Sequence, residues 1–171
     1  DKSNPPQLTI DREFRDLIRP LMKDEYRYLE STLISEGCQE PITVWKGIIV
    51  DGHNRYEICT RLGMPFDTRE QHFDNREEAI IWICARQLGR RNISDETRRY
   101  LIGKRYEAEK VIAAKRNYNG WNQYRKREHS GDLPYEVIDP DAQQEKIRTS
   151  QRIGEEYHLA HGTVEKYGTY S

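Results

Sequence analysis

The stretch Asp51–Arg55 contains the residues whose types and spacing most clearly indicate a binding or catalytic site in this chain. It directly follows the β-branched run Ile48–Val50, and apolar residues recur at helical spacing after it. A glycine between a strand and a helix leaves unpaired N–H groups at the helix N-terminus, which together with the helix dipole favour an anion. Arg55 and His53 can add charge and hydrogen bonds to a phosphate. We therefore predict a phosphate-binding turn, and the alternative is a tight turn that simply requires glycine.

The elements that must position this turn precede it in the chain. Lys46-Gly47 separates two β-branched runs and predicts a hairpin whose second strand leads into the turn. Residues 23–36 have an amphipathic helical pattern, and Gly37 is expected to end that helix. The expected apolar stripe of this helix is Tyr26, Leu29, Leu33 and Ile34. The first 20 residues are expected to form an extended lead-in.

Downstream of the turn, the pattern predicts a helix that ends near Leu62, followed by a short strand within residues 66–73. Asp74 and Glu77 have the spacing of a capping box. They precede an apolar helix that is expected to end at about Leu88, just before a basic turn. The first half of the chain therefore combines helices with a small sheet.

A long basic helix is predicted from Ser94, a good N-cap, to about Asn117. The formal net charge of −1 hides a segregation of charge along the chain. Residues 86–127 carry 13 Lys and Arg against 4 Asp and Glu, whereas residues 1–85 and 128–171 each have a net charge of −5. Such a block favours a polyanionic partner. The alternative is a solvated helix that pairs with its acidic neighbours.

Duplex DNA is the polyanion that we expect this block to contact through its phosphates. The expected contacts are Arg90, Arg91, Arg98, Arg99, Lys104 and Arg105. Tyr118, Trp121 and Tyr124 follow, interleaved with amide and basic residues, and can stack on bases. The alternative for these aromatic residues is that they anchor an irregular segment to a core.

The segment 149–167 predicts two short helices around a tight turn, which is a helix-turn-helix. Its second helix begins near Gly162, and the polar residues expected to read bases are His161, Thr163 and Lys166. The glycine common in such turns is replaced by His158. A generic helical hairpin is the alternative. His158 and His161 do not belong to a larger Cys/His cluster in the sequence, so we expect no metal site there.

Composition bounds the class of protein. With 171 residues, 35% apolar and 33% charged, the chain can hold one sizeable domain or two small ones. We expect two: a nucleotide- or phosphate-binding domain over 1–93 and a helical DNA-binding region over 94–171. The sequence contains no apolar run long enough for a membrane helix, and three cysteines without a CxxC pair favour a reducing cytoplasm. Because the chain begins with Asp1, we expect a piece of a longer protein.

The ordered set of motifs resembles the ParB/sulfiredoxin-like superfamily. The segment 29–37, followed by Pro41-Ile42-Thr43-Val44, is similar to the helix–glycine–proline–strand entry of ParB N-terminal domains. Asp51–Arg55 resembles their phosphate-binding box. Residues 86–92 occupy the place of their third nucleotide-site motif, and the helix-turn-helix follows in the same order.

This resemblance implies an α+β fold, in which a small mixed-sheet domain is followed by an all-helical region with a helix-turn-helix at about 149–167. ParB proteins bind CTP with magnesium and clamp DNA, and older descriptions call the domain a nuclease. The nucleotide or phosphate contacts that we expect here are Gly52, His53, Asn54, Arg55, Gln87, Arg90 and Arg91.

Two positions depart from the patterns of the superfamily. Where ParB proteins usually begin the third motif with Glu-Asn, this chain has Arg86 and Gln87. A guanidinium does not ligate a cation, so we expect little or no magnesium-dependent CTP hydrolysis. Sulfiredoxins place a catalytic cysteine after the glycine of the second box, and this chain has His53 there. Free-serine kinases of the superfamily have a similar Asp-Gly-His-His-Arg box.

The expected function is that of a bacterial or phage DNA-binding protein, ParB-like, acting in plasmid partition or regulation. Its nucleotide is expected to be CTP or another nucleotide, and its full-length form a homodimer. The alternative is an enzyme of the same superfamily, a nuclease or a nucleotide-dependent phosphotransferase, with Asp51 or His53 as candidate catalytic residues.

Overall fold

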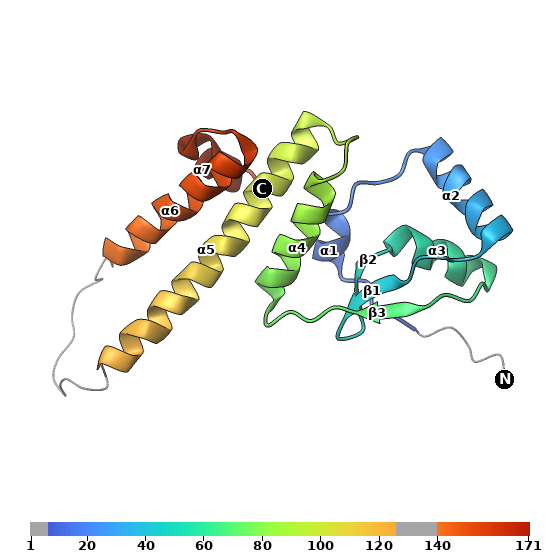
Figure 1. Ribbon diagram of the computed structural model, residues 1–171, viewed down its shortest axis with the longest axis horizontal. Coiled ribbons are helices and arrows are strands. Elements are labelled where there is room, and N and C mark those ends of the chain that lie inside the picture. Colours follow the sequence, from blue (N-terminus) through green and yellow to red (C-terminus); the bar gives the residue numbers. More distant parts are fainter. Residues whose placement is uncertain (1–6, 126–139) are drawn as a thin grey trace. The chain divides into compact units, whose positions relative to one another are not determined.

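The computed structural model describes residues 7–125 and 140–171, and side chains over 7–116 and 144–171 (Figure 1). The chain divides into two compact units, Asp1–Ala79 and Ile80–Ser171. Each unit is described by itself. The boundary expected after residue 93, between a nucleotide-binding domain and a DNA-binding region, remains a prediction.

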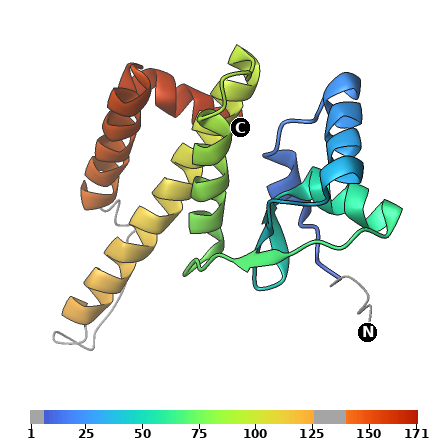
Figure 2. The same cartoon turned by 45° about the vertical axis from the view of Figure 1, so that its right-hand side comes forward.

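The first unit is an α+β structure with a three-stranded mixed sheet in the order β2-β1-β3 (Figures 1 and 2). Its elements are α1 (Arg12–Asp16), α2 (Lys23–Glu36), β1 (Ile42–Trp45), β2 (Ile48–Asp51), α3 (His53–Leu62) and β3 (Thr68–Glu70). Strand β1 pairs antiparallel with β2 and parallel with β3. The predicted hairpin, the helix over 23–36 and the helix ending at Leu62 are confirmed.

Local chemistry explains these elements. Lys46 and Gly47 both have positive φ (50° and 78°), as a two-residue type I′ hairpin turn requires. Buried Ile42, Val44 and Ile49 form one apolar cluster between the strands. Leu33 of α2 packs with Ile58 and Cys59 of α3 in a second cluster. The sheet and α2 therefore fix where α3 begins.

Three local expectations for the first unit and its last helix were wrong. The lead-in contains α1, because Asp11 accepts the Phe14 N–H (3.1 Å) and Phe14 is buried. Ile34 is 63% exposed, so it lies outside the apolar stripe of α2. The cap of α4 (Arg76–Leu88) is shifted by one residue, since the Glu78 N–H donates to Asn75 and the Asp74 N–H to Glu78. The unit boundary falls inside α4.

The second unit continues with three helices, α5 (Asp95–Arg125), α6 (Pro140–Tyr157) and α7 (His161–Thr169), and α6 and α7 both pack on α5 (Figure 1). Ser94 caps α5 as predicted, because its hydroxyl accepts the Thr97 N–H (3.1 Å). Helix α5 ends at Arg125 rather than near Asn117. A lone glycine in a helix costs only about 1 kcal/mol, so Gly120 does not end it.

Two helices, α6 and α7, flank the turn near residue 158 as predicted, but α6 begins at Pro140 and is 18 residues long rather than short. His158 has φ 57°, a left-handed conformation that glycine usually provides at such a turn. The Leu159 N–H donates to the Gly154 carbonyl (2.8 Å). A Cβ on Gly154 would lie 2.6 Å from the Leu159 carbonyl oxygen, so the turn packs directly against this glycine.

Candidate functional site at the start of α3

Gly52 joins β2 to α3 in the order that the sequence predicted. It is the N-cap of α3 and has φ 97°, in the left-handed region that L side chains rarely adopt. A Cβ at this position would lie 3.1 Å from Nη2 of Arg55 and 3.4 Å from the Ile42 Cα. Gly52 is therefore required for both its backbone conformation and the close approach of Arg55.

Arg55 lies against this glycine and uses only part of its hydrogen-bonding capacity. Its Nη1 is 2.6 Å from the Glu40 carboxylate, and its Nη2 is 3.6 Å from that of Asp51. Its Nε is buried, with no hydrogen-bond partner in the part of the chain that the structure describes. A buried cationic donor without an acceptor is costly, and an anion at the turn would satisfy it.

His53 is the second residue at this turn with buried polar atoms that lack a hydrogen-bond partner among the described residues. Its side chain is buried, with 5% of the residue exposed, and neither ring nitrogen has a hydrogen-bond partner among the described residues. Burial, followed by the positive charge of Arg15, lowers the pKa of His53 to about 4. The imidazole is therefore neutral at pH 7 and offers one N–H donor and one nitrogen acceptor.

A cavity of about 350 Å³ lies beside the first turn of α3. Its polar lining includes Arg15, Arg19, Tyr26, His53 and Asn54. Arg15 pairs with Glu57 (3.4 Å), and Arg19 with Glu25 (2.7 Å). The sequence did not reveal these two arginines as site residues, because their place depends on α1, where no helix was expected.

The other residues expected to bind nucleotide lie in the second unit. Gln87 is buried, whereas Arg90 and Arg91 are exposed. The Arg86 guanidinium lies 4.8 Å from the centre of the Trp82 ring. A site that joins these residues to the α3 turn remains a prediction, because the two units are described separately.

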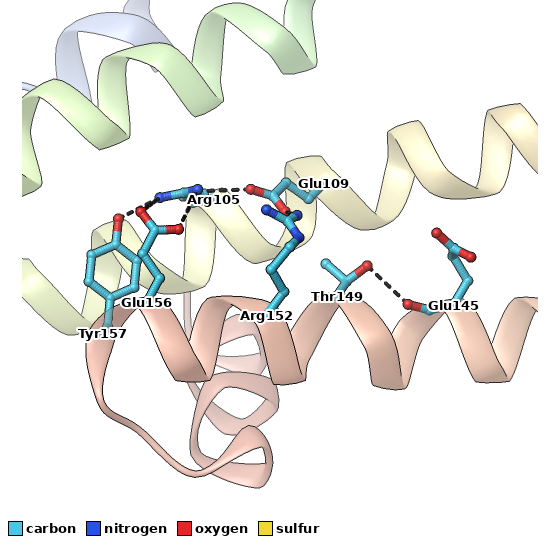
Figure 3. A network of polar contacts seen from close by, with 7 residues as sticks. All are labelled: Arg105, Glu109, Glu145, Thr149, Arg152, Glu156 and Tyr157. Carbon is cyan, nitrogen blue, oxygen red and sulfur yellow. Dashed lines mark hydrogen bonds and ion pairs between the residues drawn. The ribbon is translucent and has the colours of Figure 1, made fainter.

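The arginines and lysine expected to contact DNA differ in exposure. Arg98 and Arg99 are exposed, Lys104 is half-buried, and Arg105 is buried. Figure 3 shows Arg105 of α5 held between Glu109 of the same helix and Glu156 and Tyr157 of α6. We therefore leave Arg105 out of the proposed DNA surface.

This network uses every nitrogen of the Arg105 guanidinium. Nε donates to Glu109 (2.9 Å), Nη1 to Glu156 (2.8 Å) and Tyr157 (2.5 Å), and Nη2 to Glu156 (2.9 Å). Burial alone would lower the pKa of Arg105, but hydrogen bonds to Glu156 and Glu109 raise it overall. The hydrogen bond from Arg105 in turn lowers the pKa of Glu156. Arg152 also pairs with Glu109.

The three residues expected to read bases do not line one cavity. Thr163 and Lys166 line a cavity between α5 and α7, whereas His161 borders a separate hollow with His158 and Gly154. Over the described residues, no group of three or more His, Cys, Asp and Glu is placed to hold a metal ion. Tyr118, Trp121 and Tyr124 fall outside the described side chains. No helix in the described ranges is long and apolar enough to cross a membrane.

Comparison with solved structures identifies the fold. The structure matches two solved structures of a pNOB8-like ParB N-domain, one of them a C2221 form, each with a TM-score of 0.58 and 20% sequence identity. The alignments cover 94% of this chain and 64% and 60% of those chains, so this chain spans less than two thirds of their length. No family model and no curated protein sequence matches the chain.

Proposed function

From the ParB N-domain fold, we propose that this chain is a ParB-like, partition-type DNA-binding protein whose first unit binds phosphate groups of a nucleotide at the α3 turn. The observation that supports the phosphate site most directly is the pair of buried polar groups at Gly52. The Arg55 Nε and the His53 ring both lack partners among the described residues. Both belong to the first turn of α3, where free N–H groups also favour an anion.

The same geometry favours binding over proton transfer. A general base that works near neutral pH needs a pKa close to that pH. The pKa of His53 is lowered to about 4, and the residue is 5% exposed. Its neutral ring suits a hydrogen bond to a ligand, so the enzyme alternative gains no support from this turn.

Nucleotide binding tests the first part of the proposal. Calorimetry with CTP and with the other ribonucleoside triphosphates, each with magnesium and with EDTA, should give binding to the wild type. Gly52→Val should abolish it, because a branched side chain is incompatible with φ 97° and would fill the space of Arg55. Gly47→Ala is the matched control for a positive-φ glycine, since a Cβ there meets no atom within 4 Å. Equal affinity in folded Gly52→Val and wild-type protein would refute the site.

Duplex binding tests the second part. The cations of the second unit should contact phosphates, so affinity for a random duplex should fall steeply as salt rises. The Arg90→Ala/Arg91→Ala protein should have a shallower salt slope, because two exposed cations are lost. Arg27→Ala/Lys23→Ala, which removes two exposed cations of α2, is the matched control. Absence of duplex binding at low salt would refute this part alone.

A further inference from the structure

Helices α5 and α7 cross with unusually close backbones. A Cβ on Gly103 of α5 would lie 2.7 Å from the Tyr167 carbonyl carbon of α7. A Cβ on Gly168 would lie 2.7 Å from the Tyr106 ring. The two glycines thus allow the main chains of the two helices to approach closely. Side chains next to this crossing line the space between α5 and α7.

That space is a cavity of about 620 Å³, which we call the α5–α7 wedge. From α5 it is lined by Glu96, Arg99 and Tyr100, and from α7 and its C-cap by Lys166, Tyr167 and Tyr170. Its volume lies within the range of about 300–1,000 Å³ that is typical of small-ligand pockets. The lining residues recur at helical spacing, so each helix presents one continuous stripe to the wedge.

The wedge is lined by cationic side chains and by tyrosine rings that are partly or largely exposed to solvent. Arg99 and Lys166 are exposed, and neither has an ion pair with a carboxylate over the side chains that the structure describes. Tyr100 and Tyr167 are half-buried, and Tyr170 is 77% exposed. The Lys104 ammonium lies 5.7 Å from the Tyr100 ring and adds positive charge nearby.

We propose that the α5–α7 wedge binds one unpaired nucleotide of a nucleic acid strand. Contact with duplex phosphates requires only cations, whereas aromatic rings beside those cations offer stacking that a base can use only when it has left a duplex. Arg99 and Lys166 hold the phosphate, and the ring of Tyr170, the most exposed of the three tyrosines, stacks on the base. The Glu96 carboxylate accepts a hydrogen bond from an exocyclic amino group. This inference extends the proposed DNA binding and rests on it for the nucleic acid partner.

The experiment compares labelled oligonucleotides by fluorescence anisotropy, using the full chain. The probes are a single-stranded cytidine 12-mer, an abasic 12-mer with the same number of phosphates, and a 20-base-pair duplex. Wild-type protein should bind the cytidine 12-mer roughly tenfold more tightly than the abasic one, in keeping with the stacking energy of one base. Tyr170→Ala should remove most of this difference and leave duplex affinity within about twofold of wild type.

Tyr28→Ala is the matched control, because Tyr28 on α2 is also 77% exposed and should leave every affinity unchanged. Arg99→Ala should weaken both 12-mers alike, since it contacts the phosphate. Equal wild-type affinity for the cytidine and abasic strands overturns the wedge inference, and if duplex binding persists the proposed function stands. A base-dependent difference that survives in Tyr170→Ala also overturns it. Loss of binding to all three probes overturns both.

Discussion

Arg105 and Arg55 differ in how many of their guanidinium nitrogens have a hydrogen-bond partner. In the second unit, all three guanidinium nitrogens of Arg105 donate to Glu109, Glu156 or Tyr157, and the side chain is only 9% exposed. In the first unit, Arg55 pairs with Glu40 and Asp51 yet retains a buried Nε without a partner among the described residues. The comparison teaches that unused donors, rather than residue type, separate a candidate ligand-binding arginine from a structural one.

The largest effect is expected from Arg105→Ala. Removing one member of a buried ion-pair network leaves the buried Glu109 carboxylate with less compensation, which costs about 3–5 kcal/mol. Urea unfolding should show this loss in the free energy of unfolding. Arg148→Ala is the control, because Arg148 is exposed and pairs with Glu145 only at 3.9 Å. An unchanged midpoint for Arg105→Ala would contradict the structural role.

The pH dependence of stability should reveal the unsatisfied histidine. Because the folded pKa of His53 is about 4 and its ordinary value is 6.5, folding loses stability as pH falls from about 6.5 toward 4, where the unfolded chain is protonated first. The loss should reach roughly 2–3 kcal/mol. Asp11 and Glu156 also have lowered pKa values and add to acid unfolding at lower pH. His53→Gln should therefore flatten the profile only between 6.5 and 4, and an unaltered profile would refute the assignment.

Arg55→Ala should change stability little and ligand binding more. Its partner Glu40 is 76% exposed, so the ion pair contributes about 0–1 kcal/mol to folding. A charged hydrogen bond to a bound phosphate is worth more, and nucleotide affinity should fall roughly tenfold or further. Thermal unfolding and calorimetry on the same protein samples distinguish the two. A large loss of stability with intact affinity would make Arg55 a structural residue like Arg105.

Glu40→Gln should have the smallest effect, and in the opposite direction. The carboxylate competes with an incoming anion for Arg55, so removing its charge should raise nucleotide affinity roughly two- to fivefold. Glu36→Gln, which removes another exposed acidic side chain nearby in the sequence, should leave the affinity unchanged. A lower affinity in Glu40→Gln would show that Glu40 holds Arg55 in place for the ligand.

Features that depend on neighbouring residues were predictable from the sequence. The hairpin at Lys46-Gly47, the helix that Gly37 ends and the strand–glycine–helix order at Gly52 follow from local turn and cap chemistry. The left-handed turn at His158 was less obvious, because histidine replaces the usual glycine there. Base-edge contacts, nucleotide identity and the dimer remain predictions.

Features that depend on distant partners were not predictable in the same way. Glu40 and Arg55 are 15 residues apart and meet only because the hairpin returns the chain. Charge density alone placed Arg105 on a DNA surface, whereas Glu156, 51 residues away, holds it in a buried network. Arg15 and Arg19 reach the cavity because Phe14 anchors α1, and buried aromatic contacts of this kind leave no periodic signal in a five-residue helix.

The two edges of the small sheet bear on aggregation. Strand β3 is three residues long and exposed, and its Arg69 and Glu70 side chains discourage pairing with another chain. The opposite edge is formed by β2, where Thr9 forms a parallel bridge with Ile48 and exchanges hydrogen bonds with Gly47 and Ile49 (2.9 Å each). Residues around Thr9 thus cover main-chain groups of β2, a strand rich in β-branched residues. A truncated chain that begins at Asp11 would lack Thr9 and leave the edge of β2 open to intermolecular pairing.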